Sequence, residues 1–193
     1  VWVDQDYFFV MKFNRPVVSH IELPKAVDTE RGQRLVATFD IPRGEQLLVK
    51  VAMSTTSVEG ARRNMEAEVP TWNFAEVTRT AHDEWNSYLS RIDVTGTDTD
   101  KQNYYTAFYH ALIQPNQIAD VDGKYRNADN KVVCASNGEF YSTFSCWDTY
   151  RAAHPFYTMV IPERVVALVN SLVEQAEVQG FLPIWGLWGK ENF

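Results

Sequence analysis

The sequence predicts an α+β multidomain fragment in which short strands come first and helices follow. Three observations support this fold class. Strand-like periods fill residues 1–56, helical periods dominate from residue 57 onward, and 45% of the 193 residues are hydrophobic. A chain of this length and composition can bury a globular core, but it is small for two complete domains.

Four short strands separated by Pro and Gly turns are expected in the first part of the chain. They cover Tyr7–Phe13, Val17–Leu23, Gln33–Ile41 and Leu47–Met53. The third segment alternates apolar and polar residues, as a strand with one buried face does, and Pro42-Arg43-Gly44 marks the turn into the fourth. These segments predict an antiparallel β layer. Because four strands cannot close a sandwich, a partner sheet is expected outside them.

Two helices are expected next. Ser57 is a suitable N-cap for a short helix through Met65. Asn73, followed three residues later by Glu76, begins a second helix with a capping-box pattern. Apolar residues three or four positions apart form one stripe on this second helix: Phe74, Val77, Ala81, Trp85, Leu89 and Ile92.

Helix caps and the helix-breaking residues Pro and Gly predict the remaining elements. Thr99 is expected to open a third helix that Pro115 ends, and the Asp, Asn and Gly content of residues 120–130 predicts a turn or hairpin loop. Pro162 fits the first turn of a last long helix, and Gly180 fits its C-terminal cap. The predicted buried face of that helix consists of Val165, Val166, Val169, Leu172, Val173 and Ala176.

Charge and hydropathy exclude two classes of function. The net charge of −7 argues against nucleic-acid binding, because that affinity comes largely from Lys and Arg neutralising phosphates. No apolar run approaches the ~20 residues that a membrane helix needs. Residues 1–6 lack the features of a signal peptide, and with the apolar segment 184–189 near the other end they suggest a chain cut from a longer one. Cys134 and Cys146 are expected to be free, buried thiols.

One stretch carries candidate chemistry. Residues 141–155 place Trp147 beside Asp148, with Arg151 three residues later. Proteins bind sugars with such groups, because aromatic rings stack on the C–H faces while carboxylates and guanidinium groups hydrogen-bond the hydroxyls. The structural alternative is that Asp148 caps a helix or pairs with Arg151 while Trp147 fills the core. Spacing alone favours this alternative, because structural ion pairs outnumber functional sites.

The same stretch resembles a known family. Ser145–Arg151 is similar to the S-x-W-D-T-[YF]-R motif of the glycoside hydrolase family 92 α-mannosidases. Further segments resemble the family in the same order along the chain: Val58–Ala61, Phe74–Leu89, Tyr105–Leu112, Asp120–Arg126, Leu182–Trp185 and Gly189–Glu191. Several ordered motifs are more specific than any one of them alone.

The resemblance implies an architecture and an activity. Residues 1–56 would be the last strands of an N-terminal β-sandwich, residues 57–97 a helical linker, and residues 98–193 the first helices of an (α/α)6 barrel. The implied activity is that of a calcium-dependent, inverting exo-α-mannosidase, with α-1,2 linkages expected, that trims mannose-rich N-glycans. A secreted, periplasmic or cell-surface location is implied with it.

The resemblance also implies site residues. Asp148 would hydrogen-bond mannose hydroxyls in the −1 subsite, Trp147 would stack against the sugar, and Arg151 would orient Asp148 or reach the sugar. Because the family's catalytic acid and base lie downstream of this motif, no catalytic residue is expected in this chain, and Glu139, Glu163 and Glu191 are not assigned that role. The calcium ligands are also expected elsewhere, so no metal ligand is assigned.

The sequence departs from the family pattern at some positions, and two other functions are compatible with it. Trp185-Gly186 stands where the family usually has Trp-Glu, and Lys190 where it has Asn, and no site role is assigned to this segment. The chain could instead be a non-catalytic carbohydrate-binding module, or part of an (α/α)6 glycosidase that acts on another sugar. Uncovered apolar faces predict contact with the remainder of a longer polypeptide or self-association.

The other candidate ligands have structural interpretations. His110 and His154 are expected to be packing residues, and His20 and His82 share no zinc-like spacing. Residues 120–123 begin like a calcium loop but lack its later acidic positions, which favours a turn.

Overall fold

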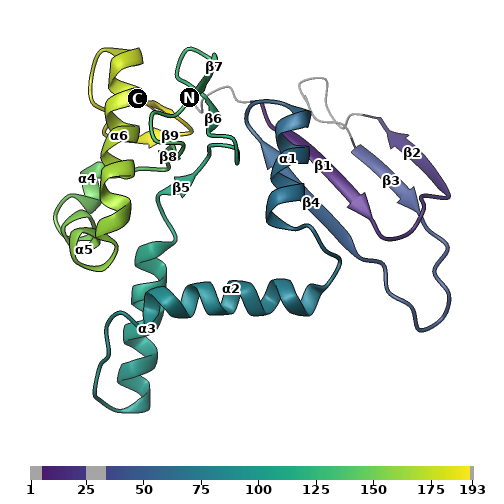
Figure 1. Cartoon of the computed structure of the whole chain (residues 1–193), viewed down its shortest axis with the longest axis horizontal. Coiled ribbons are helices and arrows are strands. Elements are labelled where there is room, and N and C mark those ends of the chain that lie inside the picture. The colour runs from purple at the N-terminus through teal and green to yellow at the C-terminus, as the bar shows by residue number, and fades with distance from the viewer. Residues whose placement is uncertain (1–5, 25–33, 192–193) are drawn as a thin grey trace.

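The computed structural model describes residues 6–24 and 34–191, and in this part of the chain helices and small sheets are mixed. A strand region with one covering helix lies on one side, and a helical region lies on the other (Figure 1). The helices of the described part are α1 Val58–Glu68, α2 Phe74–Leu89, α3 Asp98–Leu112, α4 Cys146–Thr149, α5 Ala153–Val160 and α6 Pro162–Gln179. Residues 1–5 and the first residue of the predicted strand Gln33–Ile41 lie outside the described residues.

The strands of the first part form two antiparallel pairs. β1 (Phe8–Phe13) pairs with β4 (Val49–Ser54), and β2 (Ser19–Leu23) pairs with β3 (Arg34–Thr38). The predicted antiparallel pairing is confirmed, but the four strands form two separate pairs, because within residues 6–24 and 34–191 no ladder joins them. Pro16 and Pro42 lie on the connections between the pairs, and a residue without an N–H cannot extend a ladder.

Helix α1 covers the β1–β4 pair. Its predicted cap is confirmed, because Ser57 Oγ accepts a hydrogen bond of 2.9 Å from the Gly60 backbone N–H. Val10, Ala61 and Met65 form a buried cluster between the helix and the strands. This packing gives the strand pair the hydrophobic partner that two strands alone lack.

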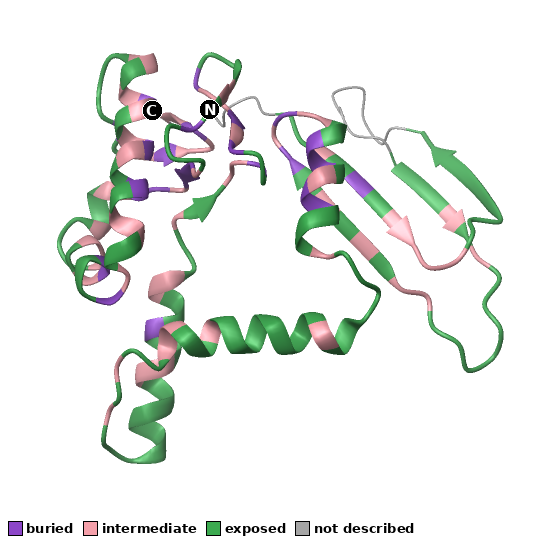
Figure 2. Cartoon of the chain, in the orientation of Figure 1, coloured by how far each residue is buried: buried purple, intermediate pink, exposed green. Residues whose placement is uncertain are grey.

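Helix α2 leads from this unit to α3 and has no buried residue (Figures 1 and 2). Its Asn73 cap is confirmed, with Asn73 Oδ1 accepting from the Glu76 N–H at 3.2 Å. The predicted apolar stripe is covered only near its end, where the Trp85 ring lies 4.5 Å from that of Tyr109. Phe74, at the other end, is 75% exposed.

Helix α3 begins two residues earlier than predicted. Thr97, not Thr99, is its cap, because Thr97 Oγ1 accepts from the Asp100 N–H while the Asp100 carboxylate accepts from the Thr97 N–H. This reciprocal capping box satisfies two terminal donors.

Helix α6 has the predicted ends, but its predicted buried face is confirmed only in part: Val165 and Leu172 pack against the core cluster. Pro162 is in its first turn, and Gly180 caps it at φ 84°. The buried residues are Ala167, Leu168, Ser171 and Gln175, whereas Val166, Val169 and Val173 are exposed by 66%, 51% and 43%. Ser171 Oγ accepts a hydrogen bond of 2.9 Å from the Tyr141 N–H, so a strand docks on a face of the helix that hydrophobicity alone does not identify.

A short hairpin joins the two sides of the molecule. β6 (Lys124–Arg126) pairs with β7 (Val132–Cys134), so the predicted loop 120–130 contains a strand as well as turns. Asp120, 2% exposed, accepts hydrogen bonds from Ser54 at 2.8 Å and Thr56 at 2.6 Å. Its other oxygen accepts from Asn64 Nδ2 of α1 at 2.8 Å. This buried carboxylate therefore holds the hairpin against β4 and α1.

The described residues also settle several smaller expectations. Residues 120–123 form a turn closed by the Gly123 N–H on the Asp120 carbonyl at 2.8 Å. Both cysteines are free, as expected, but Cys134 is exposed and Cys146 half-buried, so the expectation of buried thiols is wrong for Cys134. None of the helices described is long and apolar enough to cross a membrane.

Candidate functional site

The segment that carries Trp147 is anchored by the strand and the buried ring that precede it. β8 (Tyr141–Ser142) pairs with β5 (Asn116–Gln117), and Phe144 is 1% exposed in the cluster that includes Tyr157 and Leu168. Burial of such a ring stabilises the segment by about 2 kcal/mol or more. Helix α4 begins at Cys146, two residues after this buried ring.

The two motif segments near the end of the chain lie side by side. The Phe144 N–H donates to the Gly186 carbonyl at 3.1 Å, and the Cys146 N–H donates to the Ile184 carbonyl at 2.9 Å. Ser142 Oγ donates to the Gly186 carbonyl at 3.1 Å and accepts from the Gly189 N–H at 2.9 Å. The structure thus brings residues 182–191 against residues 142–146, a contact that the sequence analysis did not predict.

A tight hairpin completes that second segment. β9 (Gly186–Leu187) pairs with β10 (Lys190–Glu191) across Trp188 and Gly189, whose φ angles are 58° and 76°. Two consecutive positive φ values match the right-handed twist of the flanking strands, as in type I′ turns. The Glu191 carboxylate accepts hydrogen bonds from the Ile184 N–H at 2.7 Å and from the Trp185 N–H at 3.2 Å. These bonds hold the two residues that precede β9 against β10.

Thr143 has an unusual backbone conformation two residues before the motif. Its φ of 64° is rare for a β-branched residue and costs on the order of 1–3 kcal/mol. The Asn116 N–H donates to Thr143 Oγ1 at 3.0 Å, and Thr143 Oγ1 donates to Asn116 Oδ1 at 2.8 Å. Ser145 and Cys146, which follow this turn, are half-buried, and Trp147 and Asp148 are exposed.

The three predicted site residues are on the surface. The Trp147 side chain is 66% exposed, and Asp148 and Arg151 are exposed as well. Asp148 Oδ2 accepts a hydrogen bond of 2.5 Å from Ser145 Oγ, while Oδ1 accepts none from the residues described. The site therefore presents a free aromatic face beside a carboxylate oxygen that can accept a hydroxyl hydrogen.

Two parts of the structural alternative do not hold. Trp147 does not fill a core, and Asp148 forms no ion pair with Arg151 in residues 6–24 and 34–191. Arg151 instead donates from Nε to Tyr150 Oη at 2.9 Å, with its guanidinium carbon 5.3 Å from that ring. Ser145 is the residue that orients Asp148, and the Ser-x-x-Asp spacing at a helix start was the signal for it.

The three glutamates set aside on sequence grounds all have structural partners. Arg164 donates to Glu139 at 2.7 Å, and Arg91 donates to Glu163 at 2.7 Å. Glu191 caps the loop described above. His154 packs near the Phe144 and Tyr157 rings, and burial lowers the pKa of its imidazole, consistent with a packing role.

No group of three or more His, Cys, Asp or Glu side chains in the described ranges is placed to hold a metal ion. Asp120, the most buried carboxylate named above, is bonded by hydroxyl and amide donors rather than left open. These residues do not by themselves fit a calcium site, which takes six to eight oxygen ligands.

A known protein family matches more than half of the chain. Residues 60–193 match the family described as "Glycosyl hydrolase family 92 catalytic domain". No curated protein sequence matches the chain.

Solved structures match nearly the whole chain. The family GH92 alpha-mannosidase BT3965 from Bacteroides thetaiotaomicron is 29% identical, with a TM-score of 0.85 over 96% of this chain and 27% of its own. That protein has also been solved in complex with mannoimidazole. The family GH92 inverting mannosidase BT2199 from the same species is 27% identical, with a TM-score of 0.86 over 97% of this chain and 27% of its own. The chain thus spans about a quarter of the length of these relatives.

Proposed function

The chain belongs to glycosyl hydrolase family 92, and we propose that it is part of an inverting exo-α-mannosidase that removes α-1,2-linked mannose from mannose-rich glycans. The observation that carries this proposal is the exposed pair formed by Trp147 and Asp148 on a rigid segment. Support comes from the similarity to two family GH92 mannosidases, one of which binds mannoimidazole.

The roles of the motif residues follow from their geometry. The exposed Trp147 ring offers a flat apolar surface on which the C–H face of a pyranose can stack. Asp148 Oδ1 accepts a sugar hydroxyl, while Ser145 holds Oδ2 and so fixes the carboxylate plane. Arg151, held by Tyr150, contributes a positive charge at the edge of the site. These residues bind and orient the sugar.

Hydrolysis with inversion needs two carboxyl groups about 6.5–9.5 Å apart, one to protonate the leaving oxygen and one to activate water. Glu139 and Glu163 are each bound to an arginine, and Glu191 to two backbone N–H groups. We therefore place the catalytic acid and base in a part of the enzyme outside this chain.

The proposal extends to architecture, cofactor and location. Residues 1–56 are assigned to the end of a β-sandwich, 57–97 to a linker and 98–193 to the start of an (α/α)6 barrel. Calcium is proposed for the longer enzyme, with ligands outside the described residues, and no step above depends on it. Because the substrates are extracellular glycans, a secreted, periplasmic or cell-surface location is proposed. The exposed Val166, Val169 and Val173 on α6 would contact the remainder of the polypeptide or a second copy.

The test is mannose release from α-1,2-mannobiose, with calcium or with EDTA, by this chain and by the longer gene product. Release by the longer product alone, lost in EDTA, is expected. Asp148→Asn in the longer product is expected to lower kcat/KM by about 100-fold or more, whereas Asp83→Asn on the exposed part of α2 leaves it unchanged. Release by this chain alone would refute the placement of the acid and base. Binding without turnover by the longer product would favour a carbohydrate-binding module, and activity on another sugar would favour a different glycosidase.

A further inference from the structure

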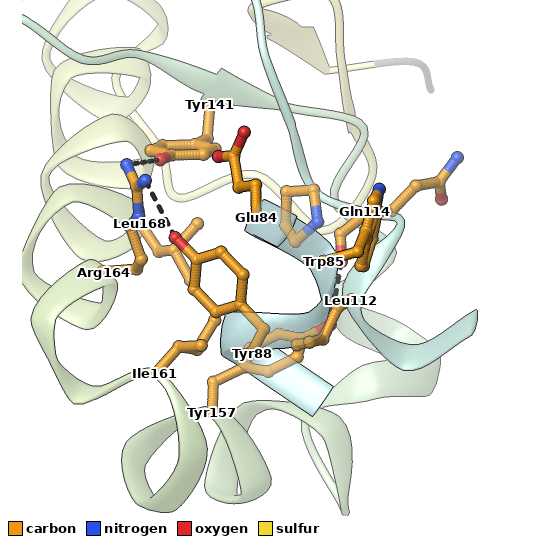
Figure 3. Close-up of a pocket in the computed structure, with 11 residues that line it drawn as sticks. Glu84, Trp85, Tyr88, Leu112, Gln114, Tyr141, Tyr157, Ile161, Arg164 and Leu168 are labelled. Carbon is orange, nitrogen blue, oxygen red and sulfur yellow. Dashed lines mark hydrogen bonds between the residues drawn. The ribbon is translucent and has the colours of Figure 1, made fainter. Parts of the chain in front are cut away.

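A cavity lies away from the Trp147 segment, between α2 and the helices and strand that follow it. It has a volume of about 280 Å³, and residues of α2, of the end of α3, of β8, of α5 and of α6 line it (Figure 3). Trp147, Asp148 and Arg151 do not contribute to its walls. The size falls at the lower end of small-molecule sites and suits one monosaccharide unit.

The polar groups gather in one part of this cavity. Arg164 donates to the hydroxyls of Tyr141 at 3.0 Å and of Tyr88 at 3.3 Å. Because each hydroxyl accepts from the arginine, its own hydrogen is available for another acceptor, and no residue described accepts it. Arg164 also donates to Glu139 at 2.7 Å, so the guanidinium is fixed by three partners.

Glu84 adds the complementary group. Glu84 is an exposed residue of α2 that also lines the cavity, and Figure 3 shows its side chain among those of the other lining residues. Its carboxylate accepts no hydrogen bond and forms no ion pair within residues 6–24 and 34–191. The cavity lining therefore offers one carboxylate acceptor and two hydroxyl donors. A sugar can bond with both kinds of group, since each of its hydroxyls both donates and accepts.

The remaining walls are aromatic or apolar. The rings of Trp85 and Tyr157 and the side chains of Leu112, Ile161 and Leu168 face the space. The Trp85 ring is held against Tyr109 at 4.5 Å, so it is a fixed surface for the C–H groups of a pyranose.

We propose that this cavity is a second carbohydrate site, in which Glu84, Tyr88 and Tyr141 bind the hydroxyls of one pyranose and Trp85 packs on its C–H face. This site is separate from the catalytic subsite and does not depend on the proposed hydrolytic activity. It would let the protein hold one sugar residue of a glycan while another is processed.

The test uses this chain and the probe methyl α-D-mannopyranoside. The indole N–H signal of Trp85 is identified by its loss in Trp85→Phe, and its NMR shift is followed as the probe is raised to about 100 mM, because single-sugar contacts give weak binding. A saturable shift is expected. Glu84→Gln keeps the shape of the side chain and is expected to raise the Kd about tenfold, because a charge-assisted hydrogen bond is lost. Tyr88→Phe is expected to raise it about three- to tenfold.

The controls separate this site from the motif site. Asp83→Asn changes the neighbouring carboxylate on the same helix and should leave the Kd within about twofold. Trp147→Ala should also leave the Trp85 shift unchanged. No saturable shift, an unchanged Kd in Glu84→Gln, or loss of the shift in Trp147→Ala would each overturn the proposal.

Discussion

The substitution Gly60→Ala in α1 should destabilise the chain, although the same change at an exposed helix position stabilises by about 1 kcal/mol. A Cβ atom at this position would lie 2.4 Å from Asp120 Oδ2 and 2.6 Å from Ser54 Oγ. Asp120 is 2% and Ser54 4% exposed, so neither side chain can move into open space. The added methyl must therefore push the carboxylate out of its hydrogen bonds or shift the helix.

The magnitude follows from these contacts. Overpacking of a well-packed site costs about 1–3 kcal/mol, and weakening of a hydrogen bond to a buried carboxylate costs about 1.5–3 kcal/mol. After the gain in helix propensity is subtracted, we expect a loss of about 2–4 kcal/mol in the free energy of unfolding. Urea unfolding followed by far-UV circular dichroism measures it. Glu66→Ala on the exposed side of the same helix, where the carboxylate is 61% exposed, serves as the control and should change stability by less than about 0.5 kcal/mol. A Gly60→Ala chain as stable as the original would refute this account of the junction.

Three further expectations concern the site and the helical region. Trp147→Ala should alter the free energy of unfolding by less than about 0.5 kcal/mol, because the ring is exposed, and unfolding of this variant by circular dichroism would show a core role instead. Arg164→Met should lower stability by about 2–3 kcal/mol in urea unfolding, because Glu139 and Tyr141 lose a charged donor, and a neutral result would show that these bonds contribute little. Burial lowers the pKa of His154 in the folded chain, so below about pH 6.5 the unfolded chain binds more protons and stability falls as the pH is lowered. His154→Asn should remove this part of the pH dependence of the unfolding midpoint, and an identical pH profile in the variant would contradict it.

The parts of the fold that could be predicted from sequence are those fixed by neighbouring residues. The Ser57 and Asn73 caps and the Gly180 end of α6 depend on groups within three or four positions, and the structure confirms them. The start of α3 was missed by two residues because Thr97 and Thr99 are chemically alike, and the hydrogen bond that the Thr97 N–H donates to the Asp100 carboxylate distinguishes them.

The faces that helices bury could not be read in the same way. Three predicted valines of α6 are exposed while Ser171 and Gln175 are buried, because β8 and the 184–191 loop dock on that face through hydrogen bonds. Hydrophobic periodicity detects apolar area but not polar docking, so it found Val165 and Leu172 but missed the polar part of the buried face. The two separate strand pairs were missed for a related reason, since pairing partners are set by long-range contacts.

The motif located the candidate site in the sequence but did not predict its geometry. The adjacency of Trp147 and Asp148 is visible in the sequence, whereas the positive φ of Thr143 and the bond from Ser145 to Asp148 depend on the folded segment.

Helix α2 has no buried residue, so we expect it to unfold locally at a lower free energy than the packed helices. Amide hydrogens exchange through local unfolding, and segments with few buried contacts open at the lowest free energy. The amides of α2 should therefore exchange before those of α1 and α6, which pack on Val10 and Tyr141. Since α2 supplies Glu84, Trp85 and Tyr88 to the cavity of Figure 3, a bound sugar would slow exchange along this helix more than anywhere else in the described part of the chain.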